Sequence, residues 1–174
     1  MAQGYISATI DGNYIDNCTI EWSNEYDPEP DFSGGFSFGA LSVTDNVFLS
    51  GDVAPWFAYL VMKPHGSGHY LTGLNVTGNK FRSINGSITR VDLVDTSFAE
   101  LDMSKGKNVL FAGNTFHNIA TPSYNPLRVT HNQNSASNTW NVATEGQLPF
   151  GGRCRGVDAV VATGRLRNSS GATV

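Results

Sequence analysis

The sequence predicts an all-β fold, a right-handed parallel β-helix of about four to five coils followed by an irregular β segment. Three observations support this prediction: a turn motif that recurs about every 33 residues, apolar residues that alternate beside each turn, and a composition rich in glycine. Charged residues make up only 15% of the 174 residues, and 19 residues are glycine, which favours turns and strands over helices. A hydrophobic share of 40% is enough for a packed core.

The repeat consists of an apolar residue, any residue, Gly or Asp, Asn, any residue and a second apolar residue. It occurs as IDGNYI, VTDNVF, VTGNKF and FAGNTF, with the asparagines at Asn13, Asn46, Asn79 and Asn114. These asparagines are 33, 33 and 35 residues apart. A weaker fifth copy is expected at Trp140 and Val142, with Glu145 in the asparagine position. A fixed period of this length indicates coils that stack on one another.

Apolar residues alternate with other residues on both sides of each turn, which predicts a strand, a tight turn and a second strand. Stacking would place like residues in columns inside the tube. The expected columns are Ala8, Leu41, Leu74 and Val109; Ile10, Val43, Val76 and Phe111; and Ile15, Phe48, Phe81 and Phe116. The Gly or Asp of each turn is expected to have a positive φ. The stacked asparagines are expected to form a ladder of side-chain amides.

Apolar stretches at 56–62, 88–94 and 127–129 predict a further strand in each coil. The leucine-rich repeat is the alternative, because residues 38–48 and 71–81 match its pattern. The period found here is longer than the ~20–29 residues of that class, so a coil of three strands is favoured. Residues 96–106 stay open between a helix and a coil strand, and we favour the strand.

We expect two parts in the chain: parallel coils over residues 1–145 and a C-terminal segment over 146–174. The second part lacks the asparagine repeat but contains the strand-like sequence DAVVATG at 158–164. It is expected to cap the open end of the stack, where strand edges would otherwise stay unpaired, or to begin a further segment. Both ends look cut, so we expect either a fragment or ends that are covered by partners.

The run VLFAGNTFHNI at 109–119 resembles the pectate-lyase-like right-handed β-helix superfamily, which includes tailspikes, polysaccharide lyases and glycoside hydrolases. The resemblance covers roughly residues 5–142. It implies that the asparagine ladder marks the turn between the second and third strands of a coil. It also implies that polysaccharide is held on the face built by the first strand of each coil, which follows the long loop after the phenylalanine column.

Such enzymes act by β-elimination, which needs a base and usually calcium, or by hydrolysis, which needs two carboxyl groups. The candidate catalytic residues are Asp92, Asp95, Glu100 and Asp102, together with Arg90. Solvated loop residues are the alternative for this cluster, which carries no catalytic motif. The candidate carbohydrate-binding residues are Trp56, Tyr59, Lys63 and Tyr70, since aromatic rings can stack on sugars. A position of Trp56 inside the coil is the alternative.

No metal site is predicted, and calcium is the one cofactor that the chemistry admits. His65 and His69 lack an evident third ligand. The acidic loop that contains Glu21, Glu25, Asp27, Glu29 and Asp31 lacks the ligand order of a calcium loop. Cys18 and Cys154 are expected to be free thiols. Glycosylation sequons at Asn17, Asn75, Asn85 and Asn168 are expected by chance in such a composition.

The formal net charge is −4 and no basic stripe is present, which argues against nucleic acid as a partner. No apolar run approaches the ~20 residues that span a bilayer. The sequence therefore predicts a polysaccharide-processing or polysaccharide-binding domain of a secreted, surface or phage-type spike protein. The alternative is a non-catalytic structural or receptor-binding segment of a trimeric fibre. An extracellular or virion-surface location and a homotrimer are expected.

Overall fold

The computed structural model describes residues 7–27, 29–31, 35, 37–135, 137–165 and 170–172. Short strands dominate it, and the helical content of the described residues is one 3-10 turn, η1 (Pro149–Gly151). The strands are β1 (Ala8–Asp11), β2 (Tyr14–Asp16), β3 (Ile20–Ser23), β4 (Ser37–Thr44), β5 (Val47–Ser50), β6 (Leu60–Lys63), β7 (Tyr70–Thr77), β8 (Lys80–Ser83), β9 (Asp92–Val94), β10 (Lys107–Ala112) and β11 (Thr115–His117).

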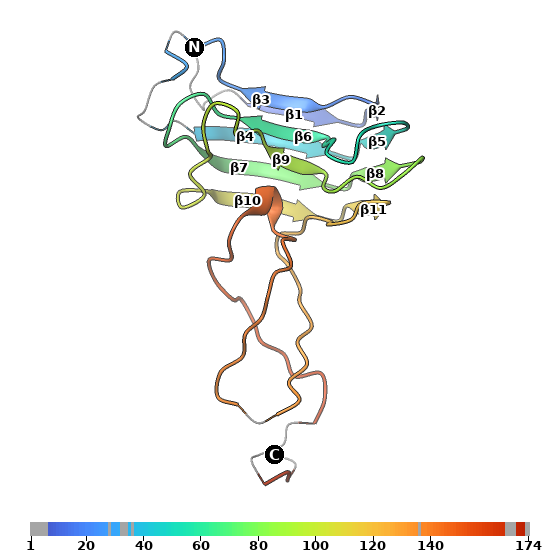
Figure 1. Cartoon of the computed structure of the whole chain (residues 1–174), viewed down its shortest axis with the longest axis vertical. Helices are drawn as coiled ribbons and strands as arrows, with labels where there is room; N and C mark the ends of the chain where they lie inside the picture. The colour runs from blue at the N-terminus through green and yellow to red at the C-terminus, as the bar shows by residue number, and fades with distance from the viewer. Residues whose placement is uncertain are drawn as a thin grey trace.

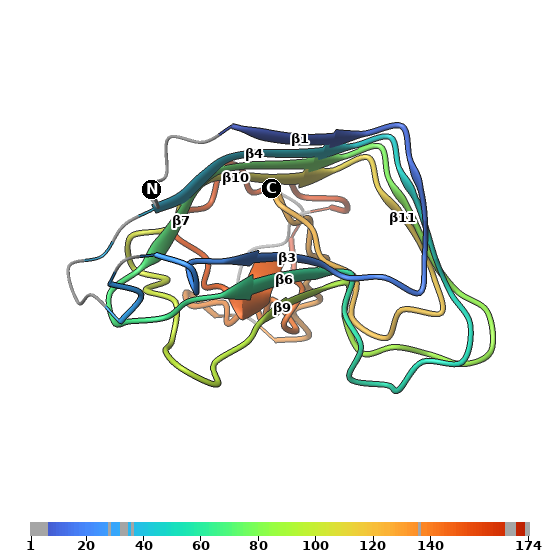
Figure 2. The same cartoon turned by 90° about the horizontal axis from the view of Figure 1, so that it is seen from above.

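The strands form three parallel sheets that together make a β-solenoid (Figure 1). Sheet A has the order β1-β4-β7-β10, sheet B the order β2-β5-β8-β11, and sheet C the order β3-β6-β9. Seen from the β1 end, the chain runs clockwise through sheets A, B and C while it moves away from the viewer (Figure 2). The winding is therefore right-handed, as the sequence predicted.

The strand register confirms the predicted interior columns. Phe48 pairs with Phe81 and Phe81 with Phe116, and their rings stack at centroid distances of 4.8 Å and 5.6 Å. The other predicted columns are also in register: Ala8, Leu41, Leu74 and Val109, and Ile10, Val43, Val76 and Phe111. Because every column runs along the solenoid axis, the core is continuous from coil to coil.

The predicted asparagine ladder is present at the turn between sheets A and B. The Oδ1 atom of Asn79 accepts hydrogen bonds from the main-chain N and the Nδ2 of Asn46, both at 3.0 Å. Asn114 holds Asn79 in the same way, and Asn46 holds Asn13. The preceding residues Gly12, Asp45, Gly78 and Gly113 all have φ between 54° and 71°, which confirms the expectation of left-handed backbone at this turn.

Several finer expectations are wrong. Within the described residues, the stack has three complete coils and two strands of a fourth, fewer than the predicted four to five. The proposed fifth copy forms no strand, and Trp140 and Val142 are 55% and 50% exposed. No strand forms at 127–129 or at 158–164, because neither stretch has a neighbouring strand to pair with. The leucine-rich repeat alternative is wrong, because sheet C occupies the position that the helices of such a repeat would take.

Residues 96–106 form neither the favoured strand nor a helix. The carboxylate of Asp95 accepts a hydrogen bond from the main-chain N of Ser97, and that of Asp102 accepts one from the main-chain N of Ser104, each at 3.0 Å. Such side-chain bonds to the local backbone produce turns and compete with strand pairing.

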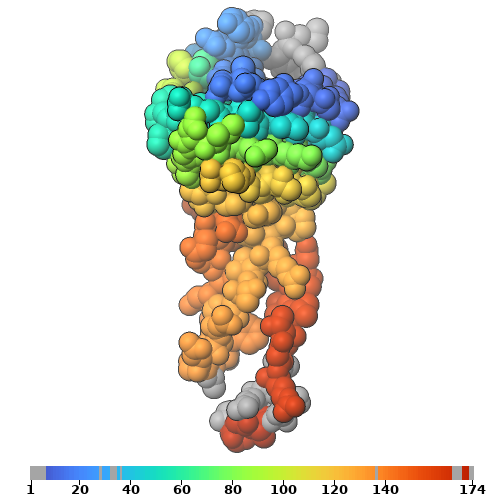
Figure 3. Space-filling view, turned by 90° about the vertical axis from the view of Figure 1, so that its right-hand side faces the viewer, coloured from blue at the N-terminus to red at the C-terminus, as the bar shows by residue number. Residues whose placement is uncertain are grey.

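The lower end of the stack is covered by two segments that meet there. Asn125 bridges to Phe111 of β10, and the ring of Phe150 packs against that of Phe111 at 6.1 Å. Beyond these contacts lies the C-terminal arm, which consists of a loop (126–145, described except for residue 136) and a tail (153–165). Figures 1 and 3 show the arm extending below the last coil as a stem much narrower than the stack. No helix among the described residues is long and apolar enough to cross a membrane.

Candidate functional site

The outer face of sheet C gathers apolar and charged side chains that the sequence marked as candidates. Leu93, in the middle of β9, is 41% exposed, while Asp92 beside it is fully buried inside the tube. Strand alternation therefore turns Leu93 outward, and the register places Val61 of β6 and Glu21 of β3 in line with it. Lys63, two residues after Val61, points to the same side of the sheet.

Trp56 stands at one end of this face. It is 79% exposed, so the alternative that it lies inside the coil is wrong. Its loop is held by a hydrogen bond from the main-chain N of Thr89 to the carbonyl of Pro55, at 2.9 Å. Trp56 and Leu93 line a shallow pocket of about 280 Å³ together with Phe57, Ala58, Thr89, Arg90 and Asp92. The indole thus borders a largely apolar depression.

Lys63, Phe98 and Asp95 form the other end of the face. The Lys63 ammonium lies 5.4 Å from the centre of the Phe98 ring, within the range of a cation–π interaction. His65 also contacts that ring, and its imidazole stacks on it at a centroid distance of 4.1 Å. Hydrogen bonds from the hydroxyl and main-chain N of Ser97 lower the pKa of Asp95, and the charge of Lys63 adds to this effect.

We define the sheet C face as Trp56, Val61, Leu93, Lys63, Asp95 and Phe98. Three of these six residues were named from the sequence: Trp56, Lys63 and Asp95. Leu93 and Phe98 were missed as surface residues, although the alternation in β9 could have indicated Leu93. Phe98 is 63% exposed and lies on an irregular loop, so periodicity gave no signal for it.

Two predicted aromatic contacts are placed elsewhere. Tyr59 is fully buried, and its hydroxyl donates to the Arg82 carbonyl and is hydrogen-bonded to the Ser50 hydroxyl. Burial raises the pKa of Tyr59 and removes its ring from any surface, so the expectation that it contacts sugar is wrong. Tyr70 begins β7 in sheet A, is half-buried, and has Lys105 Nζ 5.8 Å from its ring. It does not join the sheet C face.

Asp92 and Arg90 form a buried clamp between β9 and the C-terminal segment. The Asp92 carboxylate is fully buried and 3.1 Å from Arg90 Nη2. It also accepts hydrogen bonds from the Ser123 hydroxyl and from the main-chain N of Phe150. Arg90 donates in turn to Ser123 Oγ and to the carbonyls of Leu148 and Gly146. Both candidate catalytic side chains are thus engaged in holding the lower end of the stack together.

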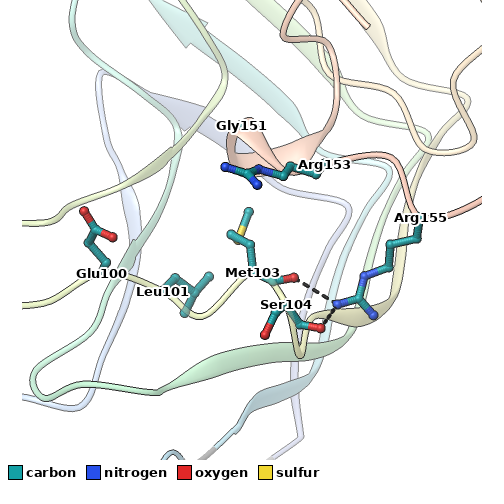
Figure 4. Close-up of a pocket in the computed structure, with 7 residues that line it drawn as sticks. All are labelled: Glu100, Leu101, Met103, Ser104, Gly151, Arg153 and Arg155. Carbon is teal, nitrogen blue, oxygen red and sulfur yellow. Dashed lines mark hydrogen bonds between the residues drawn. The ribbon is translucent and has the colours of Figure 1, made fainter.

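Glu100 and Asp102 lie on a separate loop. Glu100 lines a second pocket of about 650 Å³, together with Leu101, Met103, Ser104, Gly151, Arg153 and Arg155 (Figure 4). Arg155 donates to the carbonyls of Met103 and Ser104, so it joins the tail to this loop. Asp102 pairs with Lys105 at 3.2 Å, and a hydrogen bond from the Ser104 hydroxyl is the main cause that lowers the pKa of Asp102.

The two loop histidines have structural neighbours. His69 is fully buried, with its Nε2 atom 2.7 Å from the His65 carbonyl. Asn24 also binds the His65 main chain, accepting from its N at 2.7 Å and donating to its carbonyl at 2.8 Å. Within the part of the chain that the structure describes, no three His, Cys, Asp or Glu side chains form a group that could hold a metal. The sequon at Asn168 lies outside the described residues.

The fold and this site define the class of protein, a right-handed parallel β-solenoid whose third sheet presents an aromatic and charged outer face. Comparison with protein-family models, with curated proteins and with solved structures found no match to this chain.

Proposed function

We propose that this chain is a polysaccharide-binding segment of a surface or spike protein, and that it binds through the sheet C face. The observation that carries the proposal is the position of Trp56, which is 79% exposed beside the apolar pocket that it shares with Leu93. A large indole held open to solvent costs the fold apolar burial, about 25 cal/mol for each Å². Binding of a ligand would offset that cost.

The chemistry of the face suits a sugar chain. The faces of sugar rings carry C–H groups that pack on Trp56 and Leu93, while hydroxyl groups at their edges need hydrogen-bond partners such as Lys63 and Asp95. Because β6 and β9 run side by side, the apolar and charged ends of the face lie along one strand direction. An extended polymer can therefore contact both ends.

The resemblance to pectate-lyase-like β-helices supports the same surface. In that superfamily the asparagine ladder marks the turn before the third strand of a coil, and polysaccharide lies on the sheet that follows the next long loop. Here the ladder lies between sheets A and B, so the corresponding sheet is sheet C. Membership of this superfamily is part of the proposal.

Neither Asp95 nor Asp102 suits the general acid of a hydrolase. A general acid at neutral pH needs a raised pKa, whereas the pKa values of Asp95 and Asp102 are lowered. Both oxygens of the Asp92 carboxylate are already engaged by protein donors. We therefore propose that the sheet C face binds its ligand without cleaving it.

The test is affinity electrophoresis against neutral and acidic polysaccharides, with the Trp56→Ala variant beside the unmodified chain. We expect retardation by at least one polysaccharide, and at least a tenfold loss of affinity in the variant, which equals about 1.4 kcal/mol. Tyr26→Ala is the matched control, because Tyr26 is 93% exposed but is not part of the sheet C face. Equal retardation of Trp56→Ala, or none of the unmodified chain by any polysaccharide, would contradict the proposal.

A second readout addresses catalysis. The same polysaccharides are incubated with the chain and assayed for new reducing ends and for unsaturated products. We expect neither product. Formation of either one, lost in Glu100→Gln but not in Tyr26→Ala, would show that a carboxylate acts on the substrate and would contradict the non-catalytic part of the proposal.

A further inference from the structure

The pocket that Glu100 lines is separate from the sheet C face. Two segments build it, the loop of residues 100–104 and the stretch of residues 151–155. Its volume is about 650 Å³, which falls in the ~300–1,000 Å³ range of sites for small molecules. None of its lining residues belongs to the pocket beside Trp56. It is therefore a second place where this chain can hold a ligand.

The floor of this pocket is apolar and well packed. Leu101 is 7% exposed and belongs to the core of the solenoid, and Met103 packs against that core. A Cβ placed on Gly152 would lie 3.3 Å from Met103 Cε, so the methionine methyl group also lies against the backbone of the opposite segment. The floor offers a small apolar surface that suits an aliphatic group.

Both walls of the pocket are held in place by hydrogen bonds. The main-chain N of Asp102 donates to the carbonyl of His69 at 2.6 Å, which ties the loop to the solenoid. Arg155 donates to the carbonyls of Met103 and Ser104, which ties the tail to the same loop. The pocket is therefore formed before any ligand enters, and binding need not order either segment.

Two opposite charges border the pocket without meeting each other. Glu100 and Arg153 both line it, but neither forms an ion pair with a residue that the structure describes, since both ion pairs there involve other side chains. Figure 4 shows Glu100 at one end of the pocket, Arg155 at the other, and the Arg153 guanidinium turned toward the side of Glu100. A carboxylate and a guanidinium are thus available to a ligand across an apolar floor.

We propose that this pocket binds a small zwitterion, an amino acid whose ammonium and carboxylate groups are separated by a short aliphatic chain. The guanidinium of Arg153 offers a planar fork of N–H donors that matches a carboxylate. Glu100 accepts hydrogen bonds from the ammonium group. The aliphatic chain between the two groups lies on Leu101 and Met103, out of contact with water.

A ligand with a single charge fits this pocket less well. A simple carboxylate would place its apolar end beside Glu100, and a simple amine would leave Arg153 partly desolvated without a counter-charge, which costs free energy. Arg155 already donates to two carbonyl oxygens, so Arg153 and Glu100 are the charges that a ligand can satisfy. A molecule with one group of each sign satisfies both.

NMR of the full chain with methyl-labelled methionine tests this proposal. Met103 lines the pocket, whereas Met62 is fully buried in the tube and serves as an internal control; Met103→Leu assigns the signal. We expect ε-aminocaproate to shift the Met103 methyl signal saturably, with a dissociation constant of about 1 mM or below, and to leave Met62 unchanged. A Met103 signal that does not move at about 50 mM ligand would overturn the proposal.

Ligands that lack one of the three features measure what each contributes. Caproate keeps the carboxylate alone, hexylamine keeps the ammonium alone, and glycine keeps both charges without the aliphatic chain. Each should bind at least about tenfold more weakly than ε-aminocaproate. Caproate or hexylamine that binds as tightly as ε-aminocaproate would show that one of the two charges plays no part, and the zwitterion proposal would be wrong.

Two variants of the pocket test the charges from the side of the protein. Arg153→Gln and Glu100→Gln should each weaken binding of ε-aminocaproate at least about tenfold, because each removes one charge-assisted pair. The matched controls are Arg165→Gln and Glu25→Gln, which change exposed residues outside the pocket and should leave the affinity unchanged. Unchanged binding in the pocket variants, or equal losses in the controls, would contradict the proposal.

The two sites can be tested separately. Trp56→Ala should keep the ligand-induced shift of Met103, and Arg153→Gln should keep the retardation of the chain by polysaccharide. The failure of the carbohydrate proposal and the failure of this one are therefore distinguishable. Loss of the Met103 shift in Trp56→Ala would place the zwitterion on the sheet C face and would overturn this inference.

Discussion

The solenoid and the C-terminal arm both contain β-branched residues, but their structures are opposite. In the solenoid, Val43 and Val76 are fully buried in adjacent coils and pair in register. In the arm, Val160 and Val161 are about three-quarters exposed and form no main-chain hydrogen bond with any residue that the structure describes. The difference shows that β-branched residues become strands when the same turn returns after a fixed interval and supplies a neighbour. Where the repeat ends, residues of the same types stay extended, exposed to solvent and without a neighbouring strand.

The largest effect is expected from opening the phenylalanine column. Phe81 is fully buried between Phe48 and Phe116, so Phe81→Ala should lower the free energy of unfolding by about 3–5 kcal/mol. The counterpart in the arm, Val160→Ala, should change the unfolding of the solenoid by less than about 0.5 kcal/mol. Urea unfolding followed by circular dichroism measures both. Equal losses in the two variants would show that the arm belongs to the cooperative unit of the solenoid.

The second largest loss of stability is expected from breaking the clamp of Asp92 and Arg90, which joins the two regions. Asp92→Asn removes the charge that faces Arg90 and places an amide donor near the main-chain N of Phe150. The loss should be about 2–4 kcal/mol, because a buried partner is left without its counter-charge. Hydrogen exchange should show early deprotection of the Phe150 amide. Unchanged protection there would mean that Asp92 does not hold the C-terminal segment.

The asparagine ladder allows a comparison between its middle and its end. Asn79→Ala leaves the buried main-chain N of Asn46 and the carbonyl of Val43 without their partners. The free energy of unfolding should fall by about 2–3 kcal/mol, since each buried polar group left without a hydrogen-bond partner costs ~1–3 kcal/mol. Asn13 is exposed at the end of the ladder, where water can replace the lost bonds, so Asn13→Ala should cost less than about 1 kcal/mol. Thermal melts of the two variants that coincide would contradict this account.

The turns give a smaller contrast. Gly78 has φ +71° and a Cβ placed on it would collide with the Asp45 carboxylate, whereas Gly12 has φ +67° and open space around it. Gly12→Ala should cost about 1–2 kcal/mol for the left-handed backbone. Gly78→Ala should cost more, because the Asp45 side chain must also move. A melting temperature that falls equally in both variants would show that the carboxylate moves freely.

The smallest effect concerns the pH dependence of Asp95. Its pKa is lowered in the folded state, chiefly by the Ser97 hydroxyl, so its contribution to stability is present above the unfolded pKa of ~3.9. That contribution is lost as the pH falls through the folded pKa. The carboxylate is largely solvated, so the change in stability should stay below about 0.5 kcal/mol.

Ser97→Ala should raise the pKa of Asp95 toward its ordinary value, and carboxyl carbon NMR titration measures this shift. Ser104→Ala, which removes the equivalent bond to Asp102, is the control and should leave Asp95 unchanged. An unaltered titration of Asp95 in Ser97→Ala would assign the lowering to other groups.

The candidate site was only partly predictable from sequence. Trp56 precedes β6, Lys63 ends it, and Asp95 directly follows β9. The three residues share a face because β6 and β9 pair. Tyr59 lies only three residues after Trp56 and has the same apolar character, yet it faces the interior. That difference is set by where the chain bends between β5 and β6, a three-dimensional property that periodicity does not encode. The role of Asp92 could likewise not be predicted from the sequence. It follows from the hydrogen bonds that Ser123 and Phe150 donate to its carboxylate.

The sequence alone determined the turn, the columns and the ladder. Each depends on residues that recur at a nearly constant interval, so that equivalent residues of successive coils contact one another. The tertiary structure decided where the coils stop and which side chains of sheet C face water. It also decided that Asp92 joins the coils to a segment 58 residues further on. The physical reason is that these outcomes depend on contacts between unlike segments at irregular separations, for which a repeat supplies no neighbour.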